Sequence, residues 1–257
     1  MNRIKETMAE KHVFALYIES LSLLLKNSAL HAKFTLVDEQ LFHRVITVLR
    51  LQVEDTCILF DQITHVTCIF IGFTGKKQLH FKIVTRQANK IYTPEIIFLL
   101  PVLKRDDYEG ALYSLTELGV NTIQLVFTQK TGQHWDAVRD GERARRIMIA
   151  AAEQSKNFAF PELKAPISFE RVVHEYSSAE KKIFFDPQGE QCFSVMEALH
   201  KKRPKEVLLL IGPEGDLTAQ EKKVVEEKGF IFCALTPTII RAVQAAAFGA
   251  GFVRSIV

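Results

Sequence analysis

Cysteine is scarce in this sequence, and its few copies lie far apart. The four cysteines, at positions 57, 68, 192 and 233, are spread over 257 residues, and none belongs to a Cys-x-x-Cys pair. Zinc modules and disulfide-stapled secreted domains depend on closely spaced cysteines. We therefore expect no metal site and no disulfide framework, and we predict that the protein works in a reducing compartment, the cytoplasm.

Long apolar segments are also lacking. The charged start, Met1–Glu6, has no signal-peptide core. The most apolar stretch, residues 239–257, is interrupted by Arg241, Gln244 and Arg254, whereas a membrane helix needs about 20 largely apolar residues. We expect instead a helix buried in protein, whose small side chains let another backbone approach closely.

Charge of one sign is not in excess either. The chain has 33 Lys and Arg against 30 Asp and Glu, a net charge of +3. This mild basicity permits a nucleic-acid partner without arguing for one. Hydrophobic residues make up 47% of the chain and charged residues 25%, which is typical of a globular protein with one large or two modest domains.

The first third of the chain is rich in short β-like runs. A small sheet or barrel is predicted over residues 1–85, with one helical stretch at Glu39–Leu49. A polar segment, Thr85–Pro94, is predicted to be a linker. The predicted strands are Val13–Ile18, Lys33–Val37, Thr56–Phe60, Val66–Phe70 and Leu79–Val84.

From residue 94 to 257 predicted strands alternate with predicted helices. This alternation is typical of βαβ units and predicts an α/β domain with a parallel sheet. The predicted strands are Glu95–Leu100, Thr122–Phe127, Lys182–Phe185, Val207–Ile211 and Ile231–Leu235. The predicted helices are Asp106–Leu118, Arg143–Ser155, Phe169–Tyr176, Cys192–His200, Thr218–Lys228 and a last one from Arg241 onward.

A loop with two glycines follows one of the predicted buried strands. Gly212 and Gly215 come directly after Val207–Ile211, and Thr218 with Glu221 fits a capping box that opens a helix. The spacing fits neither a P-loop nor a dinucleotide fingerprint. The pattern leaves two interpretations open: an ordinary strand-to-helix turn, or a ligand loop at the carboxyl end of a parallel strand.

Basic residues cluster in two predicted helices. Arg139, Arg143 and Arg146 are spaced i, i+4, i+7 and share a helix face. Such a face either grips phosphates or is simply solvated. His43 and Arg50 are seven residues apart and are also predicted to share a face.

The densest basic run, Lys201–Lys205, lies between a predicted helix and a predicted strand. Runs of this kind are common on protein surfaces. The favoured interpretation is a solvated loop.

Several sequence blocks, in a fixed order, resemble one family. The chain resembles the SPOUT-superfamily methyltransferases of the RsmE type, which methylate N3 of a uridine in small-subunit ribosomal RNA. The resemblance covers nearly the whole chain. The blocks are Phe42–Leu51 with Leu59–Asp61, Leu100–Arg105, Thr116–Val120, Ala151–Ser155, and Ile211–Gly215 followed by Glu221.

The resemblance implies a fold, a cofactor and partners. It implies a PUA-like β-barrel that binds RNA over residues 1–85, and a SPOUT methyltransferase domain with a C-terminal trefoil knot over residues 94–257. The implied cofactor is S-adenosylmethionine, and the implied partners are ribosomal RNA or the small ribosomal subunit and a second copy of the chain. A uridine would have to leave its stacked position to reach the site.

The resemblance also implies site residues. Arg241 is the catalytic candidate, because a cation would favour the uridine anion that attacks the methyl group. The RNA-binding candidates are His43, Arg44 and Arg50 in the segment that resembles the family's RNA-binding part, and Arg139, Arg143 and Arg146, which come from their spacing alone. The cofactor-binding candidates lie in segments that follow strands, and they are Leu100, Pro101, Ile211, Gly212, Pro213, Glu214, Gly215, Leu235, Ile240 and Ala245.

The last motif departs from the family pattern. Arg241 is kept, but Thr236 and Thr238 stand for a glycine and an arginine, Ala242–Gln244 for Thr-Glu-Thr, and Asp216 for a glycine. Three hypotheses follow. The protein is an active uridine methyltransferase, a homologue that binds RNA without methylating it, or an active enzyme with another RNA target.

Overall fold

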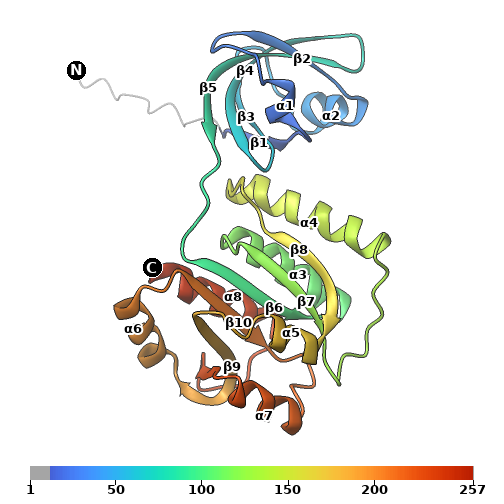
Figure 1. Ribbon diagram of the computed structural model, residues 1–257. Helices are drawn as coiled ribbons and strands as arrows, with labels where there is room; N and C mark the ends of the chain where they lie inside the picture. Colours follow the sequence, from blue (N-terminus) through green and yellow to red (C-terminus); the bar gives the residue numbers. More distant parts are fainter. Residues whose placement is uncertain (1–11, 257) are drawn as a thin grey trace, which may run out of the picture. The chain divides into compact units, whose positions relative to one another are not determined.

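The chain folds into two compact units, each described here by itself (Figure 1). The computed structural model describes residues 12–256, so the charged start, Met1–Glu6, lies outside the described residues. The amino-terminal unit covers Met1–Asn89 and the carboxy-terminal unit covers Lys90–Val257.

The amino-terminal unit contains a five-stranded sheet with the order β1-β3-β4-β5-β2. The β1–β3 pair is parallel and the other pairs are antiparallel. Alternate residues of β4 from Thr64 to Phe70 are buried, as expected for a strand with one face on a core. The elements are β1 (Phe14–Tyr17), α1 (Leu21–Leu24), β2 (Lys33–Val37), α2 (Glu39–His43), the π-helix η1 (Arg44–Val48), β3 (Thr56–Phe60), β4 (Thr64–Thr74) and β5 (Gln78–Ala88).

Two predictions in this unit are wrong. Residues 85–88 belong to β5 rather than to a linker, because they pair with β4. The helical segment ends at Val48, and Arg50 has the left-handed φ of 53°. Arg50 is therefore outside the helix and does not share a helix face with His43.

The carboxy-terminal unit is an α/β domain, as predicted. Its six-stranded sheet has the order β11-β9-β10-β6-β7-β8, and all pairs are parallel. The strands are β6 (Glu95–Pro101), β7 (Thr122–Phe127), β8 (Glu162–Ser168), β9 (Lys181–Gln191), β10 (Glu206–Ile211) and β11 (Ile231–Ala234). The helices are α3 (Arg105–Glu117), α4 (Arg139–Ser155), α5 (Phe169–Glu175), α6 (Cys192–Lys202), α7 (Ala219–Glu227) and α8 (Ala242–Ser255).

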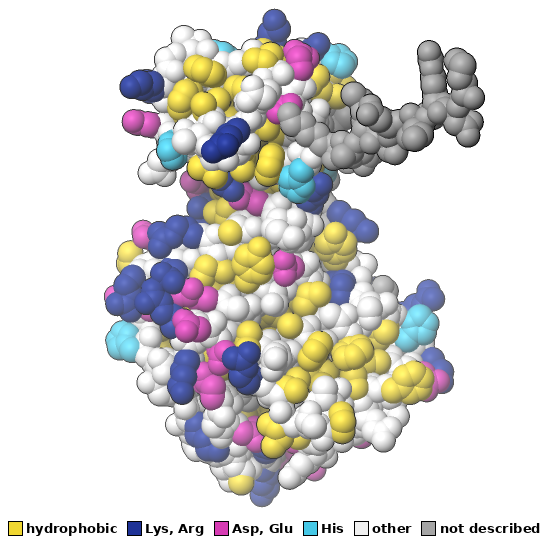
Figure 2. Space-filling model, turned by 180° about the vertical axis from the view of Figure 1, so that it is seen from behind, with side chains coloured by type: hydrophobic (Ala, Val, Ile, Leu, Met, Phe, Trp, Pro, Cys, Tyr) yellow, Lys and Arg dark blue, Asp and Glu magenta, His cyan; other side chains and the backbone are white. Residues whose placement is uncertain are grey.

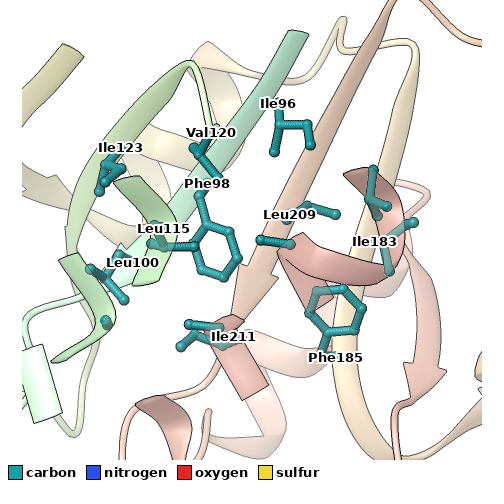
Figure 3. Packing of buried hydrophobic residues seen from close by; sticks show 14 of the residues in the cluster. Ile96, Phe98, Leu100, Leu115, Val120, Ile123, Ile183, Phe185, Leu209 and Ile211 are labelled. Atoms are coloured by element: carbon teal, nitrogen blue, oxygen red, sulfur yellow. The ribbon is translucent and has the colours of Figure 1, made fainter. Parts of the chain in front are cut away.

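Helices cover both faces of this sheet, which explains why its central strands are continuous apolar runs. Phe98 and Leu100 of β6 point into a core formed with α3, α6 and α8, and Leu209 of β10 lies beside them (Figure 3). Ile97 and Leu99 point the other way, into a core formed with α5 and α7.

Helix α8 packs against the sheet through small residues. Ala246, Gly249 and Ala250 are buried, and a Cβ at Gly249 would lie 2.2 Å from the buried ring of Phe185. The close neighbour at Gly249 is thus a side-chain ring, whereas the prediction was close approach by another backbone. None of the helices described within residues 12–256 combines the length and apolarity needed to cross a membrane.

Candidate functional site

Three loops follow the carboxyl ends of strands in the carboxy-terminal unit. They are Val102–Lys104 after β6, Gly212–Thr218 after β10 and Leu235–Arg241 after β11. Strands β6 and β10 are neighbours, with Leu99 paired to Leu210. Open parallel sheets bind ligands at this edge. The ten cofactor-binding candidates all lie in these loops, at the strand ends before them or in the first turn of α8.

The loop after β10 is a tight turn that packs closely on Gly212 at its start. The N–H of Asp216 donates to the carbonyl of Pro213 at 2.8 Å, and Asp216 has a φ of 58°. A Cβ at Gly212 would lie 2.7 Å from the carboxylate Oδ1 of Asp216. A side chain at Gly212 would therefore displace the Asp216 carboxylate, and this gives the position a reason for glycine within the loop, apart from the cofactor approach that the sequence suggested.

Two glutamates fasten this loop to its neighbours. Glu214 Oε1 accepts the backbone N–H of Lys104 at 2.7 Å, at the start of α3. Glu221 is 3% exposed, and its Oε1 accepts the N–H of Gln129 at 2.8 Å while its Oε2 accepts from Thr218. The predicted capping box is confirmed. Glu221 also ties the loop after β7 to α7.

A lysine that sequence reasoning missed braces the same loop. The ammonium group of Lys222 lies 2.6 Å from Asp216 Oδ2 and also binds the buried Asp186 within β9. Burial works to lower the pKa of Lys222, but the hydrogen bonds to Asp186 and Asp216 outweigh it and raise this pKa. The bridge to Asp186 spans 36 positions of the sequence, so no local pattern could have revealed it.

Arg241 ends the third loop, and its side chain reaches Asp107 of α3. Its backbone carbonyl accepts the first N–H groups of α8, from Gln244 at 3.0 Å and Ala245 at 2.9 Å. Its guanidinium is 3.5 Å from the carboxylate of Asp107, and 69% of its side chain remains exposed. The cation is thus held near α3 while remaining accessible from solvent.

The three arginines of α4 do not form one free basic face. Arg143 donates to both carboxylate oxygens of Glu109 on α3, which also accepts from Arg105. The Arg143 hydrogen bond is the main reason that the pKa of Glu109 is lowered. Arg139 pairs with Asp140 at 3.0 Å, and Arg146 is exposed. Arg143 therefore clamps α3 to α4.

The basic candidates of the amino-terminal unit are spread over one short segment. His43 ends α2 and is exposed, and Arg44 begins η1 and is partly buried. Arg50 is exposed beyond the end of η1. These side chains lie on the unit's surface without forming a common helix face.

The residues around the three loops suit S-adenosylmethionine. Strand β10 is buried to its last residue, Ile211, which is 1% exposed. Gly212, Gly215 and Ala245 are at least partly exposed. Small side chains there leave the main chain within reach of an adenosine or amino-acid group. Within residues 12–256, no group of three or more His, Cys, Asp or Glu side chains could hold a metal ion.

The fold defines an α/β protein, and the loops at the carboxyl edge of its sheet are a candidate small-molecule site. Comparison with known proteins is more specific: the chain belongs to the RNA methyltransferase domain family, whose model matches residues 91–254. The resemblance deduced from sequence is thereby confirmed.

Two relatives named ribosomal RNA small subunit methyltransferase E match most of the chain. The one from Synechocystis is 27% identical over 219 residues, covering 84% of this chain and 71% of its own. The one from Buchnera aphidicola subsp. Schizaphis graminum is 26% identical over 212 residues, covering 77% and 81%.

Solved structures share the fold. The ribosomal RNA small subunit methyltransferase E of Neisseria gonorrhoeae, bound to S-adenosyl methionine, superposes with a TM-score of 0.80 at 20% identity and covers 95% of this chain and 98% of that one. A Legionella pneumophila structure described as a methyltransferase in complex with SAM gives a TM-score of 0.80 at 21% identity, with the same coverage.

Proposed function

We propose that this protein transfers a methyl group from S-adenosylmethionine to N3 of a uridine in small-subunit ribosomal RNA. The family match over residues 91–254 carries the proposal. The relatives named for small-subunit ribosomal RNA support the choice of substrate. Such a substrate implies work in the cytoplasm, on ribosomal RNA or the small ribosomal subunit.

The finer fold assignment is part of this proposal. The carboxy-terminal unit is a SPOUT domain with a trefoil knot, and the amino-terminal unit is a PUA-like barrel that binds RNA. The return of the chain from β11, at one edge of the sheet, to pack α8 against α3 supports a knotted C-terminal segment. The proposed domain limits are residues 1–85 and 94–257.

Three backbone segments hold the cofactor in this proposal. They contain Leu100 and Pro101, then Ile211 to Gly215, then Leu235 to Ile240, with Ala245 closing the pocket. The bound cofactor supplies a methyl group on a sulfonium sulfur. The chain's own contribution is positioning, and alignment of reacting groups is worth up to about 7–11 kcal/mol in favourable cases. Glu214, Glu221 and Lys222 keep the central segment rigid.

Arg241 is the proposed catalytic residue. Uridine N3 carries a proton that it must lose before it can attack, and a nearby cation favours the anionic base. The guanidinium of Arg241 is exposed beside the third loop and can approach the base, while Asp107 limits its motion.

His43, Arg44, Arg50, Arg139, Arg143 and Arg146 are the proposed contacts to the RNA backbone. Figure 2 shows Lys and Arg side chains gathered over α4 on the face of the carboxy-terminal unit that it presents. Because Arg143 is committed to Glu109 and Arg139 pairs with Asp140, Arg146 is the strongest phosphate candidate of α4.

The protein is proposed to act as a homodimer through α8. Phe248 and Phe252 are 51% and 43% exposed, and together with Leu118, which follows α3, they line a shallow apolar groove. The face of the carboxy-terminal unit in Figure 2 shows hydrophobic side chains gathered where α3 and α8 lie. An apolar patch of this kind is typical of an interface.

Isothermal titration calorimetry with S-adenosylmethionine tests the proposal against a protein that binds RNA without methylating it. One cofactor bound per chain is the expected result. An absence of binding, with ribosomal RNA still bound, would establish the non-methylating alternative. Cofactor binding with methyl transfer to another RNA would establish a different target.

A further inference from the structure

The loop after β10, Gly212–Thr218, is held by two lysines that belong to different elements. We call this loop the central loop. The ammonium group of Lys130, in the loop after β7, donates to the carbonyl of Gly215 at 2.6 Å. The ammonium group of Lys222, in α7, lies 2.6 Å from the carboxylate Oδ2 of Asp216. The two contacts thus fall on neighbouring residues of the central loop.

Lys130 reaches the central loop across the end of β6. Strands β7 and β10 lie on either side of β6 in the sheet, so a side chain that joins the loops after them spans the position of β6. A Cβ added at Gly215 would lie 3.3 Å from Lys130 Cδ, so the lysine chain lies along the backbone there. The end of β6 contains Leu100 and Pro101, two of the cofactor-binding candidates. Lys130 therefore belongs to the candidate site, although no sequence pattern indicated it.

The turn that carries Lys130 is itself anchored. Thr128 is buried, and its N–H donates to Thr131 Oγ1 at 2.9 Å, while the N–H of Thr131 donates to the carbonyl of Thr128 at 3.1 Å. Between them, the N–H of Gln129 donates to the buried Glu221 at 2.8 Å. A lysine that extends from a fixed backbone has less conformational freedom to lose when it forms its hydrogen bond.

The peptide group between Gly215 and Asp216 has both of its polar atoms occupied. Its carbonyl accepts the ammonium group of Lys130, and its N–H donates to the carbonyl of Pro213 at 2.8 Å. One charged donor and one backbone acceptor therefore fix the plane of this peptide at the exposed tip of the central loop.

The side chain of Asp216 adds a second tie on the other side of β10. Asp216 stands where the family pattern has a glycine, and it adopts a left-handed φ of 58°. Its Oδ1 accepts the N–H of Leu217 at 2.7 Å, and its Oδ2 binds Lys222. Lys222 also binds Asp186 of β9, whose side chain is 2% exposed. Because a glycine could form neither contact, the carboxylate connects the central loop to β9 in a way that the family pattern does not provide.

We propose that Lys130 and Lys222 are positioning residues for S-adenosylmethionine, because by holding Gly215 and Asp216 they keep the central loop in the shape that binds the cofactor. This inference rests on the proposed function, which places the cofactor against this loop. A loop held in its binding conformation before the ligand arrives binds more tightly, since a larger fraction of the protein is competent to bind. The cofactor carries a sulfonium and an ammonium group against one carboxylate, so charge favours lysines that act through the loop over lysines that touch the cofactor.

The variants for the test separate positioning from folding. Lys130→Met removes an exposed charge, and Lys130→Arg keeps a charged donor at the same position. Asp216→Asn removes the ionic tie but leaves the pair of Lys222 with Asp186, so no buried carboxylate loses its partner. Asparagine also tolerates the left-handed conformation. The control is Lys223→Met, at a lysine of α7 whose side chain is 67% exposed.

Isothermal titration calorimetry with S-adenosylmethionine is the first measurement. Lys130→Met should raise the Kd by about three- to tenfold, as expected for the loss of one hydrogen bond. Asp216→Asn should raise it by about two- to fivefold, because its ion pair is partly exposed. Lys130→Arg should stay within about twofold of wild type. The melting temperature of Lys130→Met should match that of the control, since an exposed lysine contributes little to folding.

Methyl-transfer kinetics provide a readout that a purely structural role would not change. The KM for S-adenosylmethionine should rise in Lys130→Met, whereas kcat at saturating cofactor should stay near the wild-type value, because the occupied loop has the same shape. Binding of a small-subunit ribosomal RNA transcript should keep its wild-type affinity and salt dependence, which distinguishes a loop-positioning lysine from one that holds a phosphate.

Cofactor affinity equal to that of the control in Lys130→Met or in Asp216→Asn overturns the inference. A Lys130→Arg variant as weak as Lys130→Met also overturns it, because the charged donor would not be the acting group. Weaker RNA binding or a lower kcat with unchanged cofactor affinity overturns it as well, and would assign Lys130 to the RNA. These outcomes leave the proposed function intact, whereas a wild-type protein that binds no S-adenosylmethionine would contradict both.

Discussion

Arg241 and Asp107 form a pair that holds one cation at the edge of the third loop. The guanidinium is 3.5 Å from the carboxylate, and the arginine side chain is 69% exposed whereas that of Asp107 is 21% exposed. An ion pair this exposed is worth little to folding. The role that we propose for Arg241 is therefore electrostatic: its positive charge would stabilise the uridine anion.

Replacing Arg241 with alanine should therefore affect methyl transfer and little else. We expect kcat to fall by about 10²–10³-fold, the range for losing one preorganised group that stabilises charge. Cofactor affinity by calorimetry should remain within about twofold of wild type, because the proposed pocket is formed by backbone. Arg171→Ala, at an exposed arginine of α5, is the control. Unchanged methyl transfer in Arg241→Ala would remove the residue from the mechanism.

Gly212 offers a second test at the residue scale. A Cβ at this position would lie 2.7 Å from Asp216 Oδ1 and 3.3 Å from the nitrogen of Leu217, so the Asp216 carboxylate and the turn after β10 would have to shift. Gly212→Ala should weaken S-adenosylmethionine binding by about tenfold or more while the protein still folds, because the backbone could no longer lie against the cofactor. Gly132→Ala, where a Cβ meets nothing within 4 Å, should bind normally. Equal affinities would place the cofactor away from this loop.

Among the secondary-structure elements, α8 depends most on a single small residue. Gly249 faces the ring of Phe185, which is 7% exposed, and a Cβ would lie 2.2 Å from that ring. Gly249→Ala should destabilise the protein by about 1–3 kcal/mol through overpacking. Gly141→Ala in α4, where a Cβ has open space, should be neutral or stabilising by up to about 1 kcal/mol. Urea unfolding monitored by circular dichroism compares the two, and equal stabilities would refute the tight packing of α8.

The elements that could be predicted from the sequence are those buried on both faces or on one regular face. Strands β6 and β10 are covered on both faces, so their residues are continuous apolar runs. Strand β8 was missed because it lies at the sheet edge, contains Pro166 and has no fully buried residue. The predicted helix face shared by His43 and Arg50 is wrong, because a seven-residue spacing places two residues on one face only if the helix includes both. Here η1 ends at Val48.

The candidate site could be predicted only where its residues are close in sequence. The capping box of Thr218 and Glu221 is local, and it was found. The contacts of Glu221 to Gln129 and of Lys222 to Asp186 join residues far apart in the chain, so they depend on strand order. The family resemblance supplied the cofactor and RNA assignments, which the residue pattern alone left open.

At the scale of the whole molecule, the exposed face of α8 predicts self-association. Phe248→Asp/Phe252→Asp should convert a dimer into a monomer, because burying two carboxylates at an apolar interface is strongly unfavourable. Light scattering at micromolar concentration is the measurement. Phe193→Asp changes a phenylalanine of α6 that is 78% exposed, and this control should remain dimeric. A monomeric wild-type protein would count against the proposed interface.

The most direct test of the account is to map the methyl group. The purified protein is incubated with S-adenosylmethionine and small ribosomal subunits or small-subunit RNA without modifications, and the RNA is analysed by nucleoside mass spectrometry and reverse-transcription mapping. The proposed function predicts 3-methyluridine at one position of the RNA, formed only when protein and cofactor are both present. No methyl transfer, or a methyl group on any other base, would contradict it.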